Sequence, residues 1–101
     1  MTTAPALDVR HNEPAQRFEA LLDGELARCD YRRHGDVLRM VHTEVPRALE
    51  GRGIAAALVK AAFAHARDKN LRIEPACSYV ASYMRRHPET HDLLAPGAVL
   101  R

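Results

Sequence analysis

Hydrophobic and polar residues alternate through the first half of the chain, as they do in strands with one buried face. Residues 17–21 and residues 25–31 both follow this pattern, and Asp23-Gly24 between them is a pair that favours a tight β-hairpin turn. We therefore expect the two runs to pair as antiparallel strands. A short strand is also expected at residues 7–9, before a turn at residues 11–14.

A further alternating run, residues 37–45, is the longest strand candidate in the chain. A turn at residues 34–36 separates it from the strand before it, and Pro46 ends it because proline has no backbone N–H to donate. The first half of the chain is therefore predicted to be an antiparallel meander.

The hydrophobic period changes after Gly53, where apolar residues recur every four positions on one face of a predicted helix: Ile54, Leu58, Ala62 and Ala66. The helix is expected to run from Gly53 to about Asn70, a residue suited to the left-handed conformation that ends many helices. Residues 71–74 then form a short predicted strand that Pro75 stops. A strand, helix and strand in this order indicate a right-handed crossover with parallel pairing.

A last helix is predicted over residues 78–87, with Ser78 as its cap and Pro88 after its end. Residues 1–6 and 92–101 are expected to be irregular. Together these elements predict one α/β (α+β) domain over residues 1–101.

Composition limits the functions that this domain can have. The chain is 47% hydrophobic and 28% charged, which is typical of a folded protein, and its net charge of +2 makes nucleic acid an unlikely main partner. The two cysteines cannot form a disulfide scaffold, and the opening residues lack the apolar core of a signal peptide. We therefore expect a cytoplasmic protein with no membrane partner.

Gly51-Arg52-Gly53 lies between a predicted strand and the strongest predicted helix. Backbone amides of such a loop, together with the helix N-terminus, can form a cradle for an anion such as pyrophosphate. Glycine tolerates positive backbone angles and lets phosphate oxygens approach closely. The alternative is that both glycines only turn the chain into the helix.

The surrounding motifs resemble one family, the small stand-alone Gcn5-related N-acetyltransferase-like proteins. The resemblance covers about residues 17–91 and includes the segments that follow: His42-Thr43-Glu44-Val45-Pro46, Leu49-x-Gly51-x-Gly53-Ile54-Ala55, Pro75-x-Cys77-Ser78-Tyr79-Val80, Tyr83 and His87-Pro88.

This resemblance implies a minimal acetyltransferase fold, in which the long central strand and the strand before the last helix splay apart around a pantetheine arm. The implied ligand is acetyl-coenzyme A, with backbone groups of Thr43 to Val45 on its arm. The loop would hold its pyrophosphate through Gly51, Arg52, Gly53, Ile54 and Ala55. The chain departs from the broader family motif at Ala48, where Arg or Gln is usual, and Arg47 lies one residue earlier.

Cys77 is the preferred catalytic candidate. It falls between Pro75 and a helix start, where the helix dipole and nearby amides can stabilise a thiolate, so a covalent acetyl-thioester route is conceivable. The same cysteine recurs in the resembled family. The alternative is that Cys77 is a small buried apolar side chain.

A competing mechanism is direct attack of an amine on the thioester, which needs a base for the amine and an acid for the departing thiolate. Glu44 and His42, which alternate on one strand face, are the candidate bases. Tyr83 lies where larger relatives carry a tyrosine acid. Each of the three can instead be a solvated or packing side chain.

No metal site is expected. His42-x-Glu44 and Pro75-x-Cys77 match half of a zinc deaminase signature, but position 80 holds Val80 where a second cysteine is needed.

The predicted function is acetyl-coenzyme A-dependent N-acetyl transfer to an unidentified amine acceptor, either a small molecule or a protein. The alternative is a coenzyme-binding or protein-interaction module without turnover. A monomer or a weak homodimer that pairs through an exposed edge strand is expected.

Overall fold

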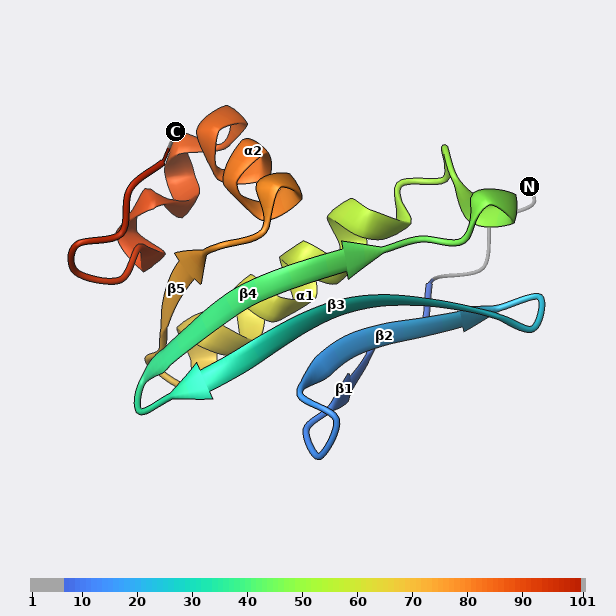
Figure 1. The fold of residues 1–101 in the computed structure, drawn as a ribbon, viewed down its shortest axis with the longest axis horizontal. Coiled ribbons are helices and arrows are strands. Elements are labelled where there is room, and N and C mark those ends of the chain that lie inside the picture. The colour runs from blue at the N-terminus through green and yellow to red at the C-terminus, as the bar shows by residue number, and fades with distance from the viewer. Residues whose placement is uncertain (1–6, 101) are drawn as a thin grey trace, which may run out of the picture.

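The structure is a computed structural model that describes residues 7–100. Its centre is one twisted sheet whose spatial order follows the chain: β1 (Arg10–Asn12), β2 (Arg17–Leu22), β3 (Glu25–His34), β4 (Val37–Glu44) and β5 (Arg72–Pro75) (Figure 1). Neighbouring strands from β1 to β4 pair antiparallel, and β5 pairs parallel with β4. The predicted α+β class, meander and parallel crossover are confirmed.

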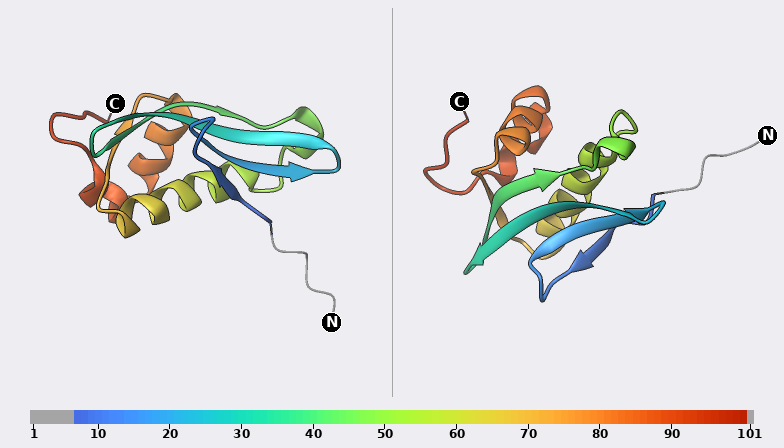
Figure 2. Two further views of the ribbon diagram at one scale, coloured as in Figure 1. Left: turned by 90° about the horizontal axis from the view of Figure 1, so that it is seen from below. Right: turned by 45° about the vertical axis from the view of Figure 1, so that its right-hand side comes forward.

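Helix α1 (Ile54–Asp68) covers one face of this sheet and forms a second layer (Figure 2). Its buried side chains include the predicted stripe and two wider positions: Ile54, Leu58, Val59, Ala62, Phe63 and Ala66. They pack in one core against inward-facing strand residues such as Phe18, Leu38 and Met40. The hydrophobic period therefore identified the contact face of the helix correctly.

Asn70 ends α1 as predicted, in the left-handed conformation with φ 57°. The amide of Leu71 donates to the carbonyl of Ala66 at 2.7 Å, and the amide of Asn70 donates to that of Arg67 at 3.3 Å. These two bonds are the Schellman arrangement, which satisfies carbonyls that the last helical turn leaves free.

An irregularity in the pairing of β3 with β4 decides which side chains of β4 face the helices. Tyr31 pairs with Met40, but its neighbour Asp30 pairs with His42, so Val41 is an extra residue on β4. Such a bulge changes the alternation of side chains along a strand. Met40 is buried before it, and after it Thr43 turns inward while His42 is exposed.

Strand β4 has a partner on both sides only in its first half. Strand β5 pairs with β4 from Val37 to Met40, and the last contact at this edge is the amide of Cys77 donating to the Met40 carbonyl at 2.7 Å. The chain then turns into helix α2 (Ser78–Arg86), away from β4 (Figure 1). The rest of β4 is thus paired with β3 alone among the described residues.

Four local predictions need correction. The first strand is Arg10–Asn12 rather than residues 7–9, because it pairs with Arg17–Glu19 across a turn at residues 13–16. The longest strand is β3, with 10 residues, against 8 in β4. Cys77, not Ser78, is the residue that precedes the first turn of α2.

The fourth correction concerns the predicted irregular tail at residues 92–101. The short helices η1 (Arg47–Leu49) and η2 (Pro88–Leu93) flank α1 and α2, so the tail is helical through Leu93. Leu94 then forms an isolated bridge with Ile73, and Leu93 is buried in the core. The predicted irregular segment at residues 1–6 lies outside the described residues.

Candidate functional site

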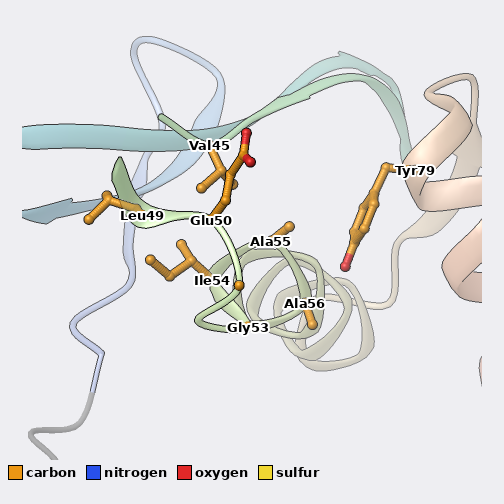
Figure 3. A pocket seen from close by; sticks show the side chains of 9 residues that line it. Val45, Leu49, Glu50, Gly53, Ile54, Ala55, Ala56 and Tyr79 are labelled. Atoms are coloured by element: carbon orange, nitrogen blue, oxygen red, sulfur yellow. The ribbon is translucent and has the colours of Figure 1, made fainter. Parts of the chain in front are cut away.

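A hollow of about 250 Å³ lies at the N-terminus of α1, between the end of β4 and helix α2 (Figure 3). Its lining joins the loop that precedes α1 to the first turn of that helix and to one side chain of α2: Val45, Leu49, Glu50, Gly51, Gly53, Ile54, Ala55, Ala56 and Tyr79. The buried side chains of Leu49 and Ile54 make its apolar floor. The hollow is smaller than the usual ~300–1,000 Å³ ligand pocket, so it suits one part of a coenzyme-sized molecule.

The two glycines of the loop have the geometry that the sequence suggested. Gly51 has φ 81° and Gly53 has φ 74°, a region that other residues adopt only with strain. An added Cβ at either position would meet no atom of the described part of the chain within 4 Å. Open space, rather than packed chain, therefore lies over both glycines.

Within residues 7–100, no protein group accepts a hydrogen bond from the backbone amides of the first turn of α1. The first bond of the helix runs from the Ala57 amide to the Gly53 carbonyl at 3.1 Å, so the amides of residues 54–56 precede the bonded ladder. Gly53 offers no side-chain cap, and the first turn holds no acidic residue. The positive end of the helix dipole is thus exposed at the hollow and favours an anion there.

Two of the predicted coenzyme-binding residues lie outside this lining. The Arg52 guanidinium is 3.5 Å from Asp23 in the β2–β3 turn, in an ion pair whose members are both more than half exposed. Thr43 lies further along β4, between two sulfur atoms. Val45, Gly51, Gly53, Ile54 and Ala55 do line the hollow as predicted.

Glu50 and Tyr79 are lining residues that the sequence argument did not select. Figure 3 shows the Glu50 carboxylate turned toward Val45 and away from Gly53, so its charge does not face the free amides. Tyr79 stands on the opposite wall, with its ring across the hollow from Glu50 (Figure 3). Tyr79 stands in the first turn of α2, and no spacing in the sequence alone indicates that it faces the start of α1.

Thr43 connects the two cysteines of the chain. Its Oγ1 lies 3.5 Å from the Sγ of Cys29 on β3 and 3.5 Å from the Sγ of Cys77 at the start of α2. Both thiols are free and buried. Burial raises the pKa of Cys29 to about 11, even though the hydrogen bond from Thr43 acts in the opposite direction.

Cys77 reaches the surface through a second hollow, of about 450 Å³, on the side of α2 that faces the chain end. The other lining residues are Pro75, Ala76, Ser78, Ala81, Arg85 and Val99. The Cys77 residue keeps 9% of its surface exposed. Cys77 is therefore buried for the most part and forms part of the wall of this hollow.

His42 and Glu44 share one strand face as predicted, with 3.4 Å between the His42 Nε2 and a Glu44 carboxylate oxygen. Both side chains are more than half exposed, and Glu44 also lies 3.6 Å from the Arg28 guanidinium. Because Thr43 between them turns inward, this pair lies on the opposite face of the sheet from Cys77. Their role as bases stays a prediction.

Tyr83 packs inside the molecule. Its ring meets Phe63 of α1 edge-on, with 5.8 Å between centroids, and stacks on His87 at 4.1 Å. Only 5% of the residue is exposed, and burial raises the pKa of its phenol. Tyr83 lines neither hollow, and its role as an acid stays a prediction.

Residues 7–100 contain no group of three or more His, Cys, Asp or Glu side chains arranged to hold a metal ion. None of the helices in that range has the length and apolar character that crossing a membrane requires.

Comparison with known proteins agrees with this arrangement. A family profile described as GCN5-related N-acetyl-transferase matches residues 17–93. The sequence is 32% identical over 91 residues to Protein NATD1 of Xenopus tropicalis, covering 87% of this chain and 84% of the relative. It is 34% identical over 83 residues to Protein NATD1 of Homo sapiens, covering 79% of this chain and 74% of the relative.

The fold is also similar to the NMR solution structure of a GCN5-like protein from Staphylococcus aureus. The TM-score is 0.71 at 28% identity, with 88% of each chain covered. The resemblance predicted from the sequence motifs is confirmed. The chain belongs to the GCN5-related N-acetyltransferase family, whose membership supports a general role in acetyl transfer.

Proposed function

We propose that the protein binds acetyl-coenzyme A in the hollow between β4, α1 and α2 and transfers the acetyl group to an amine. The observation that carries this proposal is the exposed N-terminus of α1 in that hollow, with its free amides and two left-handed glycines. The pyrophosphate would accept hydrogen bonds from the free amides of residues 54–56. Oxygen atoms can approach closely because no side chain covers Gly51 or Gly53.

The pantetheine arm would follow the half of β4 that β5 leaves open. Residues of a strand that point their side chains to one face direct their backbone groups to one edge. Met40 and Thr43 both face inward, and the Met40 carbonyl points to the β5 edge, where it accepts from Cys77. Thr43 and Val45 are therefore the residues that would offer backbone groups to the amides of the arm.

In this arrangement the arm leads from the α1 loop toward Thr43 and Cys77. The Cys77 thiolate would attack the acetyl carbonyl carbon, forming a new C–S bond while the C–S bond to coenzyme A breaks. The coenzyme would leave as a thiolate and take up a proton. An amine would then attack the acetyl carbon, release the Cys77 sulfur and lose one proton to solvent.

The acceptor amine would approach through the second hollow, because Cys77 is one of the residues that line it. Direct attack of the amine on acetyl-coenzyme A is the competing route, with Glu44 or His42 as base and Tyr83 as acid. Cys77 lines the second hollow, whereas Tyr83 lines neither hollow and the exposed His42 and Glu44 lie on the other face of the sheet. This placement favours the route through Cys77.

Calorimetric titration with acetyl-coenzyme A tests the binding site. A Gly53→Glu variant should bind at least roughly tenfold more weakly, because its carboxylate would fill the open space and repel phosphate. Gly35→Glu is the matched control, since Gly35 also has positive φ and open surroundings but lies in the β3–β4 turn. No binding to the folded protein, or equal losses in both variants, would overturn the proposed site.

Release of free coenzyme A in the presence of mixed amines tests turnover. If Cys77 accepts the acetyl group, Cys77→Ala should lose both turnover and the acetyl mass adduct on the protein. Turnover retained in Cys77→Ala favours direct attack. If acetyl-coenzyme A binds but no free coenzyme A appears with any mixture of amines, the result favours a coenzyme-binding module without turnover.

A further inference from the structure

The hydroxyl of Thr43 stands between two buried thiols that come from different parts of the fold. Cys29 is its cross-strand partner on β3, and Cys77 lies at the open edge of β4. This geometry does not favour a disulfide between the two cysteines, because β4 lies between them. Neighbouring strands are about 4.8 Å apart, so two strand spacings exceed the reach of a disulfide.

The two hydrogen bonds of Thr43 differ in direction. At Cys29 the geometry fits Thr43 as the donor, whereas at Cys77 either the hydroxyl or the thiol can donate. A hydroxyl has one proton to give and two lone pairs to accept with. Thr43 can therefore donate to only one sulfur at a time.

Two proton arrangements follow. When Cys77 is a thiol, it donates to the Thr43 oxygen, and Thr43 donates to Cys29. When Cys77 is a thiolate, it can only accept, so the Thr43 proton must turn from Cys29 to Cys77. A hydrogen bond to a charged sulfur is stronger than one to a neutral sulfur, but part of the gain is offset by the bond that Cys29 loses.

We propose that Cys29 and Cys77 compete for the single hydroxyl proton of Thr43, and that this competition sets how readily Cys77 becomes a thiolate. Thr43 and Cys29 are then positioning residues for Cys77. The inference rests on the proposed role of Cys77 as the acetyl-accepting side chain. Burial keeps the pKa of Cys29 near 11, so Cys29 competes as a neutral thiol at physiological pH.

The sharpest test is the pH dependence of alkylation at Cys77 in the full chain. Iodoacetamide reacts with the thiolate, and mass spectrometry of the Cys77 peptide gives the rate at that residue alone. Cys29→Ala frees the Thr43 proton and should move the midpoint of the rate profile to lower pH. Thr43→Val removes that donor and should move the midpoint to higher pH, each by roughly half a pH unit to one.

Thr43→Ser keeps the hydroxyl and should leave the midpoint near that of the unchanged protein. Cys29→Ser keeps an acceptor at the same place, so its midpoint should not fall as it does in Cys29→Ala. Cys29→Ser nearly preserves the size of the side chain, and Thr43→Ser removes only one methyl group. Both variants therefore remain informative if a cavity unfolds Cys29→Ala, which circular dichroism would show. A merely structural effect would change the rate at every pH rather than move the midpoints in opposite directions.

Midpoints that move together in Cys29→Ala and Thr43→Val, or that do not move, would overturn the competition. The assay contains no acetyl-coenzyme A. A failure of the proposed coenzyme site would therefore appear in the calorimetric titration and leave these profiles unchanged.

Discussion

Each end of helix α1 carries a residue in the left-handed conformation, but protein groups cap only the C-terminal end. At the C-terminal end, Asn70 and Leu71 return their amides to the last turn, and the Arg67 guanidinium binds both carboxylate oxygens of Asp92. At the N-terminal end, Gly53 begins the helix with no side-chain cap and with an open hollow beside it.

This difference indicates where the fold is complete by itself and where it can take a ligand. Amides at an exposed helix start bond to water when no protein group accepts from them, so leaving them free does not prevent folding. The same amides can exchange water for phosphate oxygens without any change in the helix. The N-terminal end can therefore serve binding, while the C-terminal end contributes stability.

The largest expected effect comes from a charge placed at the open end. Ala55→Asp should weaken the binding of acetyl-coenzyme A roughly tenfold or more, because a carboxylate close to the pyrophosphate repels it. The same substitution should raise the free energy of unfolding by about 0.3–1 kcal/mol, because a negative charge suits the helix dipole. Calorimetry and urea denaturation measure the two changes.

Ala55→Asn is the matched control, since it has the size of the aspartate variant without its charge. It should bind acetyl-coenzyme A more tightly than Ala55→Asp does. If both variants lose affinity equally, steric contact rather than charge governs the site. If Ala55→Asp lowers both stability and affinity, the two ends of α1 do not differ in the proposed way.

A smaller effect is expected at the closed end. Asn70→Val should lower the free energy of unfolding by about 1–2 kcal/mol, because a β-branched side chain is strained at φ 57°. Asn70→Gly adopts this conformation freely and should stay within about 0.5 kcal/mol of the unchanged protein. Urea denaturation gives both values, and neither variant should change the affinity for acetyl-coenzyme A. Loss of affinity in Asn70→Val alone would mean that the closed end supports the site.

Sequence patterns predicted those parts of the fold that depend on local chemistry. The stripe on α1, the turn at Asp23-Gly24 and the cap at Asn70 each follow from residue type and spacing, and each was predicted correctly. The first strand was placed three residues too early. The strand also makes a contact with a residue distant in the sequence, which alternation does not reveal: the His11 Nε2 lies 2.6 Å from the Tyr31 hydroxyl.

The candidate site also combines residues that local chemistry identifies with residues that only contacts between strands bring together. The loop glycines were found because positive φ favours one residue type at those positions. The meeting of Cys29, Thr43 and Cys77 depends on the strand register and on the bulge at Val41, neither of which alternation alone determines. Contacts between strands therefore had to come from the structure.

The smallest expected effect concerns His11 of β1, whose ring packs against His65 near the C-terminal end of α1. The ring centroids of His11 and His65 are 4.4 Å apart, and the Nε2 of His11 is 2.6 Å from the Tyr31 hydroxyl oxygen. Burial first, and then the charge of His65, lower the pKa of His11 from 6.5, while Glu13 acts in the opposite direction. The folded state thus favours neutral His11.

The sign of the pH effect follows from this lowered pKa. Neutral His11 contributes its full stability above pH 6.5, and that contribution is lost as the pH falls from 6.5 toward the lower pKa of the folded state. Thermal unfolding followed by circular dichroism gives Tm at about pH 7.5 and at about pH 5. The fall in Tm between these two pH values should be smaller in His11→Phe than in the unchanged protein, by roughly 1–4 °C. His34→Gln, at the exposed end of β3, should keep the fall in Tm of the unchanged protein. Equal falls in Tm in the unchanged protein and both variants would show that protonation of His11 does not change the stability of the protein.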